Sequence, residues 1–315
     1  IKIMCKKIPK KFSKKIEYYF YMIKTMHHLA TSKVCIVDGY VIPVSILRHK
    51  KDLVVVQIWH ALGAIKKFGK QVIDKKEGSN SVVANIMDMH KNYTFVTCAS
   101  KATREFYAKA FGVEKEKILL LGMPRIDYLL GKNNQINEKV EKLLEEYPKL
   151  KEKQNILYVP TFRKGMEDID KINELINCID YSKYNLIVKP HPLSNIKIKD
   201  ERVICDKYFS SIDMITMGDY VITDYSAIVF EASILEKPLF FYCYDYDKYY
   251  RRRNFYINYK EEMPGIITDD AKEIVNSIEN NQFDLDRVEG FRDKYIELNE
   301  GKCTSNLVDF IFKFM

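Results

Sequence analysis

The segment DYVITDYSAIVFEASILEKPLFFY, residues 219–242, decides the fold class. Its pattern predicts a buried strand at 220–223, a helix over 226–235 and a second buried strand at 239–242. Both strands are apolar almost throughout, which is typical of parallel sheets, because helices cover both of their faces. The segment therefore predicts an α/β fold with a doubly wound parallel sheet.

The same alternation of strands and helices continues in both directions along the chain. Further buried strands are expected at 34–37, 53–58, 93–98, 118–121, 155–159, 186–189 and 202–205, and helices at 102–111, 137–147 and 171–179. The alternation pauses over the polar segment 131–154, which contains no strand pattern. We therefore expect two α/β units, residues 1–135 and 136–315, with one or two helices over 291–315 belonging to the second.

The composition fits a folded two-domain protein. Of 315 residues, 47% are hydrophobic, and the chain contains 22 Tyr and 17 Phe but only 12 Gly and 9 Pro, which excludes disordered and fibrous classes. The seven cysteines form no C-x-x-C pair and have no histidine at metal-ligand spacing. We interpret them as free core thiols in a reducing compartment, and we expect no metal site and no cofactor.

Positive charge is concentrated at the start of the chain. The net charge is +8, and residues 1–24 hold eight Lys and one Glu, which gives 8 − 1 = +7 for this segment. Aromatic and aliphatic residues follow the lysines, a pattern that suits either an anionic membrane surface or an amphipathic first helix with a solvated face. No apolar stretch is long enough to span a membrane. The nearly balanced remainder argues against nucleic-acid binding.

Ligands of open α/β sheets bind beyond the carboxyl ends of the strands, so the residues that follow each strand are the candidates. The turn Thr223-Asp224-Tyr225-Ser226 gives the strongest signal. Ser226 is a suitable helix N-cap, and the free amides of the first turn would attract an anion. Glu231, further along the helix, could reach a ribose; alternatively, the helix is simply capped and Glu231 is solvated.

Three other strand ends carry polar groups. His60 follows the strand 53–58 and is suited to proton transfer, although it could also pack at the strand end. Thr161 and Arg163 suit phosphate oxygens, the alternative being a surface ion pair for Arg163. His191 lies between two prolines that fix its backbone, next to Lys189. Basic groups and two placed histidines without paired carboxylates point to phosphate chemistry in which cations, not a metal, stabilise a pyrophosphate leaving group.

Six ordered motifs resemble the CDP-glycerol glycerophosphotransferase family of teichoic acid synthesis. They are QIWHALGAIKKFG, FVTCASKATREFYAKAFG with LGMPRIDYLL, LYVPTFR, VKPHP, the stretch from Asp219 to Tyr249, and RRNFYINYKEEMPG. They span residues from about 54 to 305, most of the chain. The resemblance implies a GT-B type fold, in which two Rossmann-like domains face a cleft, with the acceptor side in the first and the CDP-donor site in the second.

The resemblance also implies an activity and roles. It implies transfer of glycerol phosphate from CDP-glycerol to a hydroxyl of a lipid-linked acceptor by direct displacement at the β-phosphate, with release of CMP, at the cytoplasmic face of the membrane. By resemblance, His60 is the base and His191 binds the donor pyrophosphate. The remaining expected site residues are Thr161, Arg163, Lys189, Asp224, Tyr225, Ser226, Ala227 and Glu231 for the donor, and Gly63, Lys66 and Arg125 for the acceptor.

Two departures and two alternatives accompany this interpretation. The family has His-Gly-Thr where this chain has His60-Ala61-Leu62, which concerns the acceptor side, and a second serine is Ala227 here. CDP-ribitol enzymes share the motifs, so the donor could be CDP-ribitol. A GT-B glycosyltransferase with a nucleotide sugar remains the other alternative, although it has no evident need for the proline-framed His191.

Overall fold

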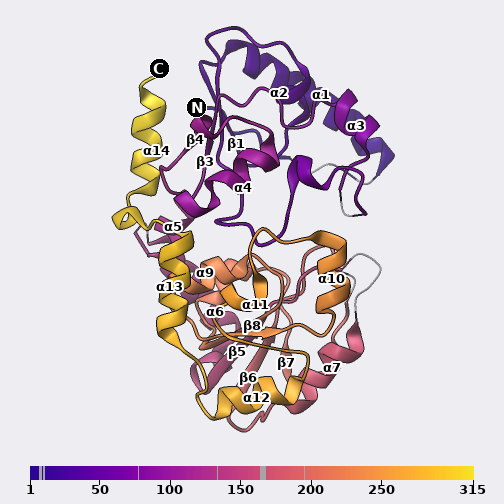
Figure 1. Cartoon of the computed structure of the whole chain (residues 1–315), viewed down its shortest axis with the longest axis vertical. Coiled ribbons are helices and arrows are strands. Elements are labelled where there is room, and N and C mark those ends of the chain that lie inside the picture. The colour runs from indigo at the N-terminus through magenta and orange to yellow at the C-terminus, as the bar shows by residue number, and fades with distance from the viewer. Residues whose placement is uncertain (7–8, 10, 77, 133, 164–167, 195) are drawn as a thin grey trace.

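The chain forms two α/β units, one above the other in Figure 1, each built on its own parallel sheet. The structure is a computed structural model that describes residues 1–315 except 7–8, 10, 77, 133, 164–167 and 195. Lys7 and Lys10 of the basic run lie outside the described residues. None of the helices in the described part of the chain is long and apolar enough to span a membrane.

The first unit has four parallel strands in sequential order. They are β1 (Val34–Val37), β2 (Val54–Gln57), β3 (Phe95–Thr97) and β4 (Ile118–Leu119). Its helices are α1 (Phe12–Thr31), α2 (Ile42–Ile46), α3 (Ser81–Ile86) and α4 (Lys101–Phe111), with 3₁₀ turns η1 (Gly69–Val72) and η2 (Lys115–Lys117). Tyr107 and Phe111 of α4 pack with Val55 and Val96 in the core of this unit.

The second unit has six parallel strands in the order β10-β9-β8-β5-β6-β7. They are β5 (Gln154–Tyr158), β6 (Tyr184–Val188), β7 (Val203–Ile204), β8 (Tyr220–Thr223), β9 (Leu239–Tyr242) and β10 (Ile266–Thr268). Its helices are α6 (Gln135–Glu146), α7 (Ile169–Cys178), α8 (Ser211–Ile215), α9 (Ile228–Ile234), α10 (Tyr246–Arg253), α11 (Tyr259–Glu262), α12 (Ala271–Glu279) and α13 (Leu285–Tyr295), with the 3₁₀ turn η3 (Pro148–Lys151).

Side chains alternate between the two faces of this second sheet, as strand geometry requires. Tyr220 and Ile222 of β8 face a core shared with α7 and α12, whereas Val221 faces the other core with α9 and α13. Every expected strand segment contains a strand. The short edge strand β10 was not expected, because its three half-buried residues carry little apolar signal.

The strand order of the second unit fixes where a ligand can enter. The chain runs from β5 outward to β6 and β7 and then returns to the opposite side of β5 as β8. The connections that leave β5 and β8 therefore diverge and leave a crevice at their carboxyl ends. Thr161 follows β5 and Asp224 follows β8, so two of the strand ends that the sequence singled out meet at this point.

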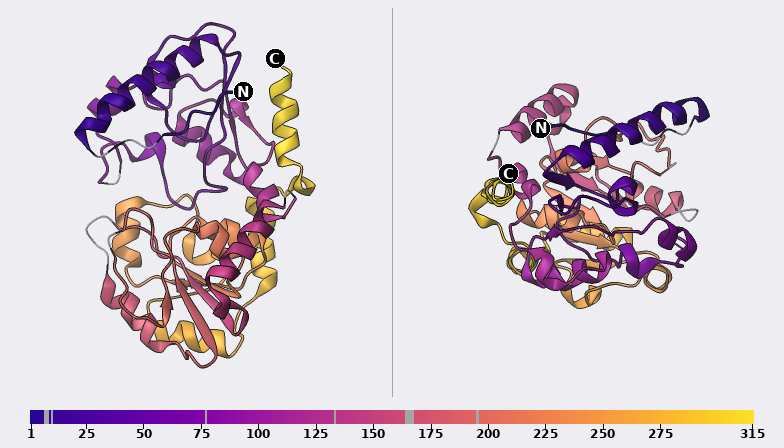
Figure 2. Two further views of the ribbon diagram at one scale, coloured as in Figure 1. Left: turned by 180° about the vertical axis from the view of Figure 1, so that it is seen from behind. Right: turned by 90° about the horizontal axis from the view of Figure 1, so that it is seen from above.

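The units are connected twice. The chain first crosses through α5 (Pro124–Leu129) and α6, and it returns after α13 through η4 (Asn299–Gly301) to α14 (Cys303–Phe312). Leu307 and Ile311 of α14 pack on Val56 of the first sheet, and Figures 1 and 2 show this helix beside the first unit. The expectation that both C-terminal helices belong to the second unit is therefore wrong for α14.

A buried carboxylate holds α14 in that position. Asp127 of α5 accepts hydrogen bonds from the backbone amides of Cys303 at 3.0 Å and Thr304 at 2.7 Å. These amides belong to the first turn of α14 and have no acceptor within the helix, so Asp127 acts as a cap supplied from another element. All seven cysteines are free thiols; Cys98, Cys243 and Cys303 are buried, and Cys5 is exposed.

Candidate active site

A cavity of about 650 Å³ opens at the carboxyl ends of β5, β6 and β8, at the reversal of strand order. Among the described residues that line it, one, Asp206, is acidic and six are basic: Lys66, Arg163, Lys189, Lys207, Arg252 and Arg253. His191, Thr161 and Ser226 also contribute to the wall. A concave site with this excess of positive charge suits a ligand that carries several negative charges.

His191 presents a donor nitrogen at the rim of this cavity. Its Nδ1 accepts a hydrogen bond from the backbone amide of Leu193 at 3.1 Å, and its ring stacks on Phe162 with the ring centres 5.4 Å apart. A nitrogen that accepts a hydrogen bond carries no proton, so in the neutral ring the proton is on Nε2. His191 can therefore donate from Nε2 to an anionic oxygen.

His60 has the opposite tautomer. Its Nδ1 lies 2.9 Å from the carbonyl oxygen of Asp38, which can only accept, so Nδ1 carries the proton and Nε2 has a lone pair. The ring is exposed and lies against the Trp59 ring, with the ring centres 4.0 Å apart and the planes tilted by 33°. Such an imidazole can take up a proton at Nε2. His60 belongs to the first unit and does not line the cavity in the second.

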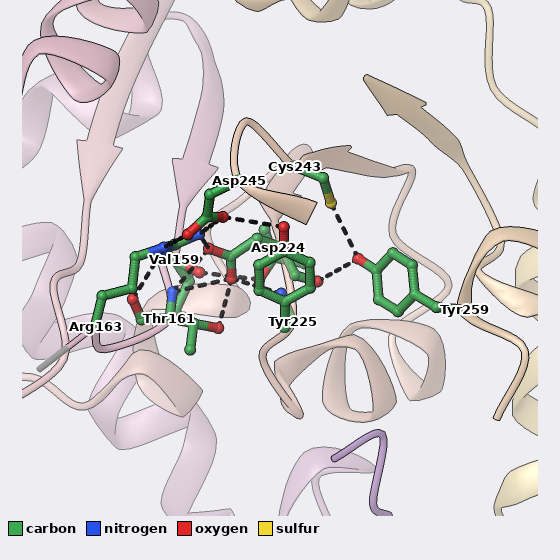
Figure 3. A network of polar contacts seen from close by, with 9 residues as sticks. Val159, Thr161, Arg163, Asp224, Tyr225, Cys243, Asp245 and Tyr259 are labelled. Carbon is green, nitrogen blue, oxygen red and sulfur yellow. Dashed lines mark hydrogen bonds and ion pairs between the residues drawn. The ribbon is translucent and has the colours of Figure 1, made fainter. Parts of the chain in front are cut away.

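Arg163 lies at the centre of a buried polar network (Figure 3). Its Nε and Nη2 donate to the Asp245 carboxylate at 2.7 and 2.9 Å, and Nη2 also lies 2.7 Å from Oδ2 of Asp224. Nη1 donates to the carbonyl of Thr161 at 2.9 Å. Burial alone would lower the pKa of Arg163, but the two carboxylates outweigh it and raise the pKa. Arg163 is thus buried and pairs with two protein carboxylates, so the surface position considered for its ion pair is wrong, whereas its contact with donor phosphates stays a prediction.

The same network uses the side chains of three other expected donor residues. The amide and hydroxyl of Thr161 donate to Oδ1 of Asp224, which also accepts from the amide of Tyr225 at 2.7 Å. The Tyr225 ring is fully buried, stacks on Tyr249, and its hydroxyl donates to Asp245. Asp224 and Tyr225 therefore shape the turn, as Figure 3 shows, and their side chains point into the protein.

The hydroxyl of Tyr259 donates to the carbonyl oxygen of Asp224 at 2.6 Å, and Cys243 lies 3.3 Å from that hydroxyl (Figure 3). These contacts connect the turn after β8 to the start of α11 and the end of β9. The turn is consequently held from both sides before any ligand binds, which is the preorganisation that an anion site needs.

The helix after the turn begins later than expected. α9 starts at Ile228 with Ala227 at the N-cap and no side-chain cap, and Ser226 Oγ accepts only a long hydrogen bond of 3.4 Å from the Ile228 amide. The expectation that Ser226 is the N-cap is therefore wrong by one residue. Ser226 still lines the cavity, with its side chain partly exposed.

Glu231 and Arg125, which were expected on opposite sides of the cleft, contact one another. Arg125 of α5 donates from Nη1 to Oε1 of Glu231 at 2.8 Å. Glu231 is 3% exposed, and burial raises its pKa against the opposing effect of Arg125. The solvated Glu231 considered from the sequence is thus wrong, and its carboxylate already has a cationic partner from another element.

The two other expected acceptor residues also have different surroundings from those anticipated. A Cβ on Gly63 would lie 2.4 Å from the Phe230 ring, so this glycine allows the loop after β2 to pack on α9 of the second unit. Lys66 lines the cavity, and its Nζ lies 5.7 Å from the centre of the Tyr249 ring. Lys189 also lines the cavity, and it donates to the carbonyl oxygen of Asp206 at 2.7 Å.

Sequence reasoning missed the cationic groups of α10 and the loop after β7. Arg252, Arg253 and Lys207 line the cavity, and the Nε of Arg253 is buried without a hydrogen-bond partner among the described residues. The run Arg251–Arg253 is visible in the sequence, but it lies at the end of a helix and not directly after a strand, where ligand-binding residues of an α/β sheet are expected. Asp245 follows β9 and was missed as the partner of Arg163, because 82 positions separate the two residues.

The chain is similar in sequence to proteins of known function. Residues 3–313 match the family described as CDP-Glycerol:Poly(glycerophosphate) glycerophosphotransferase. The chain is 32% identical over 326 residues to a teichoic acid ribitol-phosphate primase of Bacillus spizizenii, covering 100% of this chain and 84% of that protein. It is 30% identical over 299 residues to a teichoic acid glycerol-phosphate primase of Bacillus subtilis, covering 92% and 76%.

Among solved structures, the wall teichoic acid polymerase TagF, in a variant soaked with CDPG, superposes with a TM-score of 0.71. The superposition covers 89% of this chain and 72% of that one at 23% identity. At this identity the likeness concerns the fold, and together with the two sheets it confirms the expected GT-B type arrangement of two Rossmann-like units.

Proposed function

The chain belongs to the CDP-glycerol:poly(glycerophosphate) glycerophosphotransferase family, and from this premise we propose that it transfers glycerol phosphate from CDP-glycerol to a hydroxyl of a lipid-linked acceptor. As a member it is a polyol-phosphate transferase of teichoic acid or related polymer synthesis. The observation that carries the proposal is the cavity at the strand-order reversal, whose charged wall is six-to-one basic.

The donor pyrophosphate lies in this cavity. His191 donates to it from Nε2, while Lys66, Lys207, Arg252 and Arg253 supply positive charge. The network around Arg163 acts one layer below, where it holds Thr161 and the turn after β8 in place. Since the wall already carries fixed cations, little reorganisation is needed when negative charge moves onto the leaving CMP.

The reaction is a direct displacement. The acceptor hydroxyl oxygen attacks the β-phosphorus, its proton passes to Nε2 of His60, and the bond between the β-phosphorus and the bridging oxygen breaks. CMP leaves with the electron pair of that bond, and His191 and the cations stabilise its charge. The two opposite tautomers support this division, because one ring has a lone pair for the incoming proton and the other has a proton for the anion.

The test uses purified protein, lipid-linked acceptor and either CDP-glycerol or CDP-ribitol, with CMP release and product mass as readouts. We expect His60→Ala to lose turnover by a factor on the order of 10³ while binding of the CDP donor persists. His49→Ala is the matched control, because this histidine is on the same unit but its Nε2 contacts the Val44 carbonyl. Full turnover in His60→Ala would refute the assigned base.

CDP-ribitol is the alternative donor, favoured by one observation. The match to the ribitol-phosphate primase covers 100% of this chain, at 32% identity. The same assay decides between the two polyols, because the mass added per transfer differs. A product formed only from CDP-ribitol would replace glycerol in the proposal and leave the chemistry unchanged.

The same proposal includes a peripheral position on an anionic membrane at the cytoplasmic face. α1 has one face packed on the first unit through Leu29, and another on which large apolar side chains are exposed: Ile16, Tyr19, Phe20, Ile23 and Met26. Their spacing places them on one side of the helix. Lys14 and Lys24 are exposed on the same element. Apolar rings beside lysines suit insertion at the headgroup level.

Cosedimentation with vesicles tests this position. We expect binding to phosphatidylglycerol-containing vesicles and loss of binding in Phe20→Glu/Ile23→Glu, with turnover on a soluble acceptor analogue retained. Val308→Glu/Phe312→Glu, exposed on α14, is the matched control. If both double variants bind vesicles like the wild type, α1 is not the membrane surface.

A further inference from the structure

Gln57, the last residue of β2, is a fully buried amide directly upstream of His60. Its Oε1 accepts a hydrogen bond from the backbone amide of Trp59 at 2.9 Å, and its Nε2 donates to the backbone carbonyl of Gly39 at 2.9 Å. One side chain thus connects two backbone segments that belong to different strand ends. Because the Gln57 amide is itself fully buried, its polar atoms depend on hydrogen-bond partners within the protein.

The first segment is the turn that carries His60. Trp59 has a backbone φ of +54°, a left-handed conformation that non-glycine residues seldom adopt. The turn is held in place by the hydrogen bond from the Trp59 amide to Gln57 and by the Trp59 ring, which stacks on Phe68 with the centres 5.2 Å apart. The reversal of the chain at this point brings the His60 ring back against the loop after β1.

The second segment is the loop after β1, which contains Asp38 and Gly39. This loop determines which ring nitrogen of His60 carries the proton. The Asp38 carbonyl accepts from Nδ1 of His60, and the next carbonyl, that of Gly39, accepts from Gln57. The side chains of Gln57 and His60 contact this loop at two successive carbonyls, and the Ile58 amide donates to the Val37 carbonyl just before it. If Gly39 moved away, the Asp38 carbonyl would move with it, and nothing would keep the proton on Nδ1.

We propose that Gln57 is a positioning residue that holds the strained Trp59 turn and the Asp38–Gly39 loop together and so keeps His60 in the tautomer whose Nε2 is a base. This inference rests on the proposed function for its catalytic meaning only. The tautomer itself is a property of the folded chain and can be measured without substrate. A merely structural role for Gln57 would change stability and leave the position of the His60 proton as it is.

Two variants separate the two hydrogen bonds. Gln57→Met has nearly the same length and loses both, whereas Gln57→Glu keeps an acceptor for the Trp59 amide and, when ionised, cannot donate to Gly39. Thr97→Val is the matched control, because Thr97 is equally buried at the end of the neighbouring strand β3. Its hydroxyl donates a long hydrogen bond of 3.5 Å to the Ile58 carbonyl in the same turn, so this variant removes a contact of the turn and leaves both hydrogen bonds of Gln57 in place. If one Gln57 variant does not fold, the other still tests the loop contact.

The first readout is the ¹⁵N spectrum of histidine-labelled protein above pH 8, in which His60 is assigned by the signals that His60→Ala lacks. We expect an unprotonated Nε2 in the wild type and in Thr97→Val, and a protonated Nε2 in a large fraction of both Gln57 variants. A protonated Nε2 in the wild type, or an unchanged tautomer in both Gln57 variants, overturns the proposal.

The second readout is kinetic. We expect kcat to fall roughly 10²-fold in Gln57→Met, because the base is misplaced or has the wrong tautomer, while KM for the CDP donor changes less than about twofold. A raised KM with unchanged kcat would contradict a role through His60. If the tautomer shifts as expected but His60→Ala retains turnover, then the assigned base is wrong and the positioning inference stands.

Discussion

Replacement of Arg163 by methionine tests whether the buried network, rather than a direct phosphate contact, is the role of this residue. The change removes a guanidinium that is 3% exposed and leaves the carboxylates of Asp224 and Asp245 facing one another. Removing one partner of a buried ion pair costs about 3–5 kcal/mol, because the remaining charge has no counterion. At roughly 2–4 °C per kcal/mol for a unit of this size, we expect Tm to fall by roughly 6–20 °C.

The loss depends on pH in a defined direction. Without the cation, one of the two carboxylates is stabilised by taking up a proton, and protons are available at low pH. The folded variant then binds more protons than its unfolded chain, so its stability rises as pH falls. We expect the difference in Tm between wild type and Arg163→Met to be largest near pH 8 and to shrink towards pH 5.

Thermal unfolding followed by circular dichroism measures this, and Arg202→Met is the matched control. Arg202 pairs with Asp200 at 2.6 Å but is half exposed, so its loss should leave Tm unchanged. A Tm of Arg163→Met equal to that of the wild type, together with weakened CDP-donor binding, would refute the network role and restore the direct contact.

Three further perturbations follow from the described contacts. Asp127→Asn should lower the free energy of unfolding, measured with urea at pH 7, by about 1–2 kcal/mol, because it weakens the docking of α14. Although burial opposes ionisation, the amides of Thr304 and Cys303 lower the pKa of Asp127. The stabilisation by Asp127 should therefore persist above pH 3.8 and vanish as pH falls below it. Gly63→Ala should cost about 1–3 kcal/mol, because its Cβ meets the Phe230 ring, and Phe230→Leu should restore part of it. Lys66→Met should raise KM for the donor roughly fivefold, with a smaller salt dependence, and a wild-type KM would place Lys66 outside the donor site.

The sequence predicted the structural features that depend on residues close to one another along the chain. The strands and the residues that follow them were readable, because burial and strand-end position are local properties of the pattern. The side chains that pair with one another across the fold could not be predicted. Arg163 pairs with Asp245, 82 positions away, and Arg125 with Glu231, 106 positions away, and no spacing rule connects them.

The predictions of the N-cap at Ser226 and of the unit to which α14 belongs were wrong for related reasons. Ser226 has the chemistry of an N-cap, but the turn after β8 is fixed by the contact of Tyr259 with the Asp224 carbonyl, which delays the helix to Ile228. The apolar face of α14 was compatible with either unit. α14 packs on the first unit because Asp127 accepts hydrogen bonds from its first turn and because the helix covers Val56.

The two crossings between the units have a mechanical consequence. A single linker would let one unit rotate about any axis, but here α5 and the start of α14 run next to each other and are bonded through Asp127. Two adjacent connections leave one easy rotation, about the line that joins them. Any rotation of one unit against the other is thereby confined to a hinge, so the proposed base His60 would approach the cavity of the second unit along a single path. A cut before α14 would release this constraint and leave Val56 of the first sheet in contact with water.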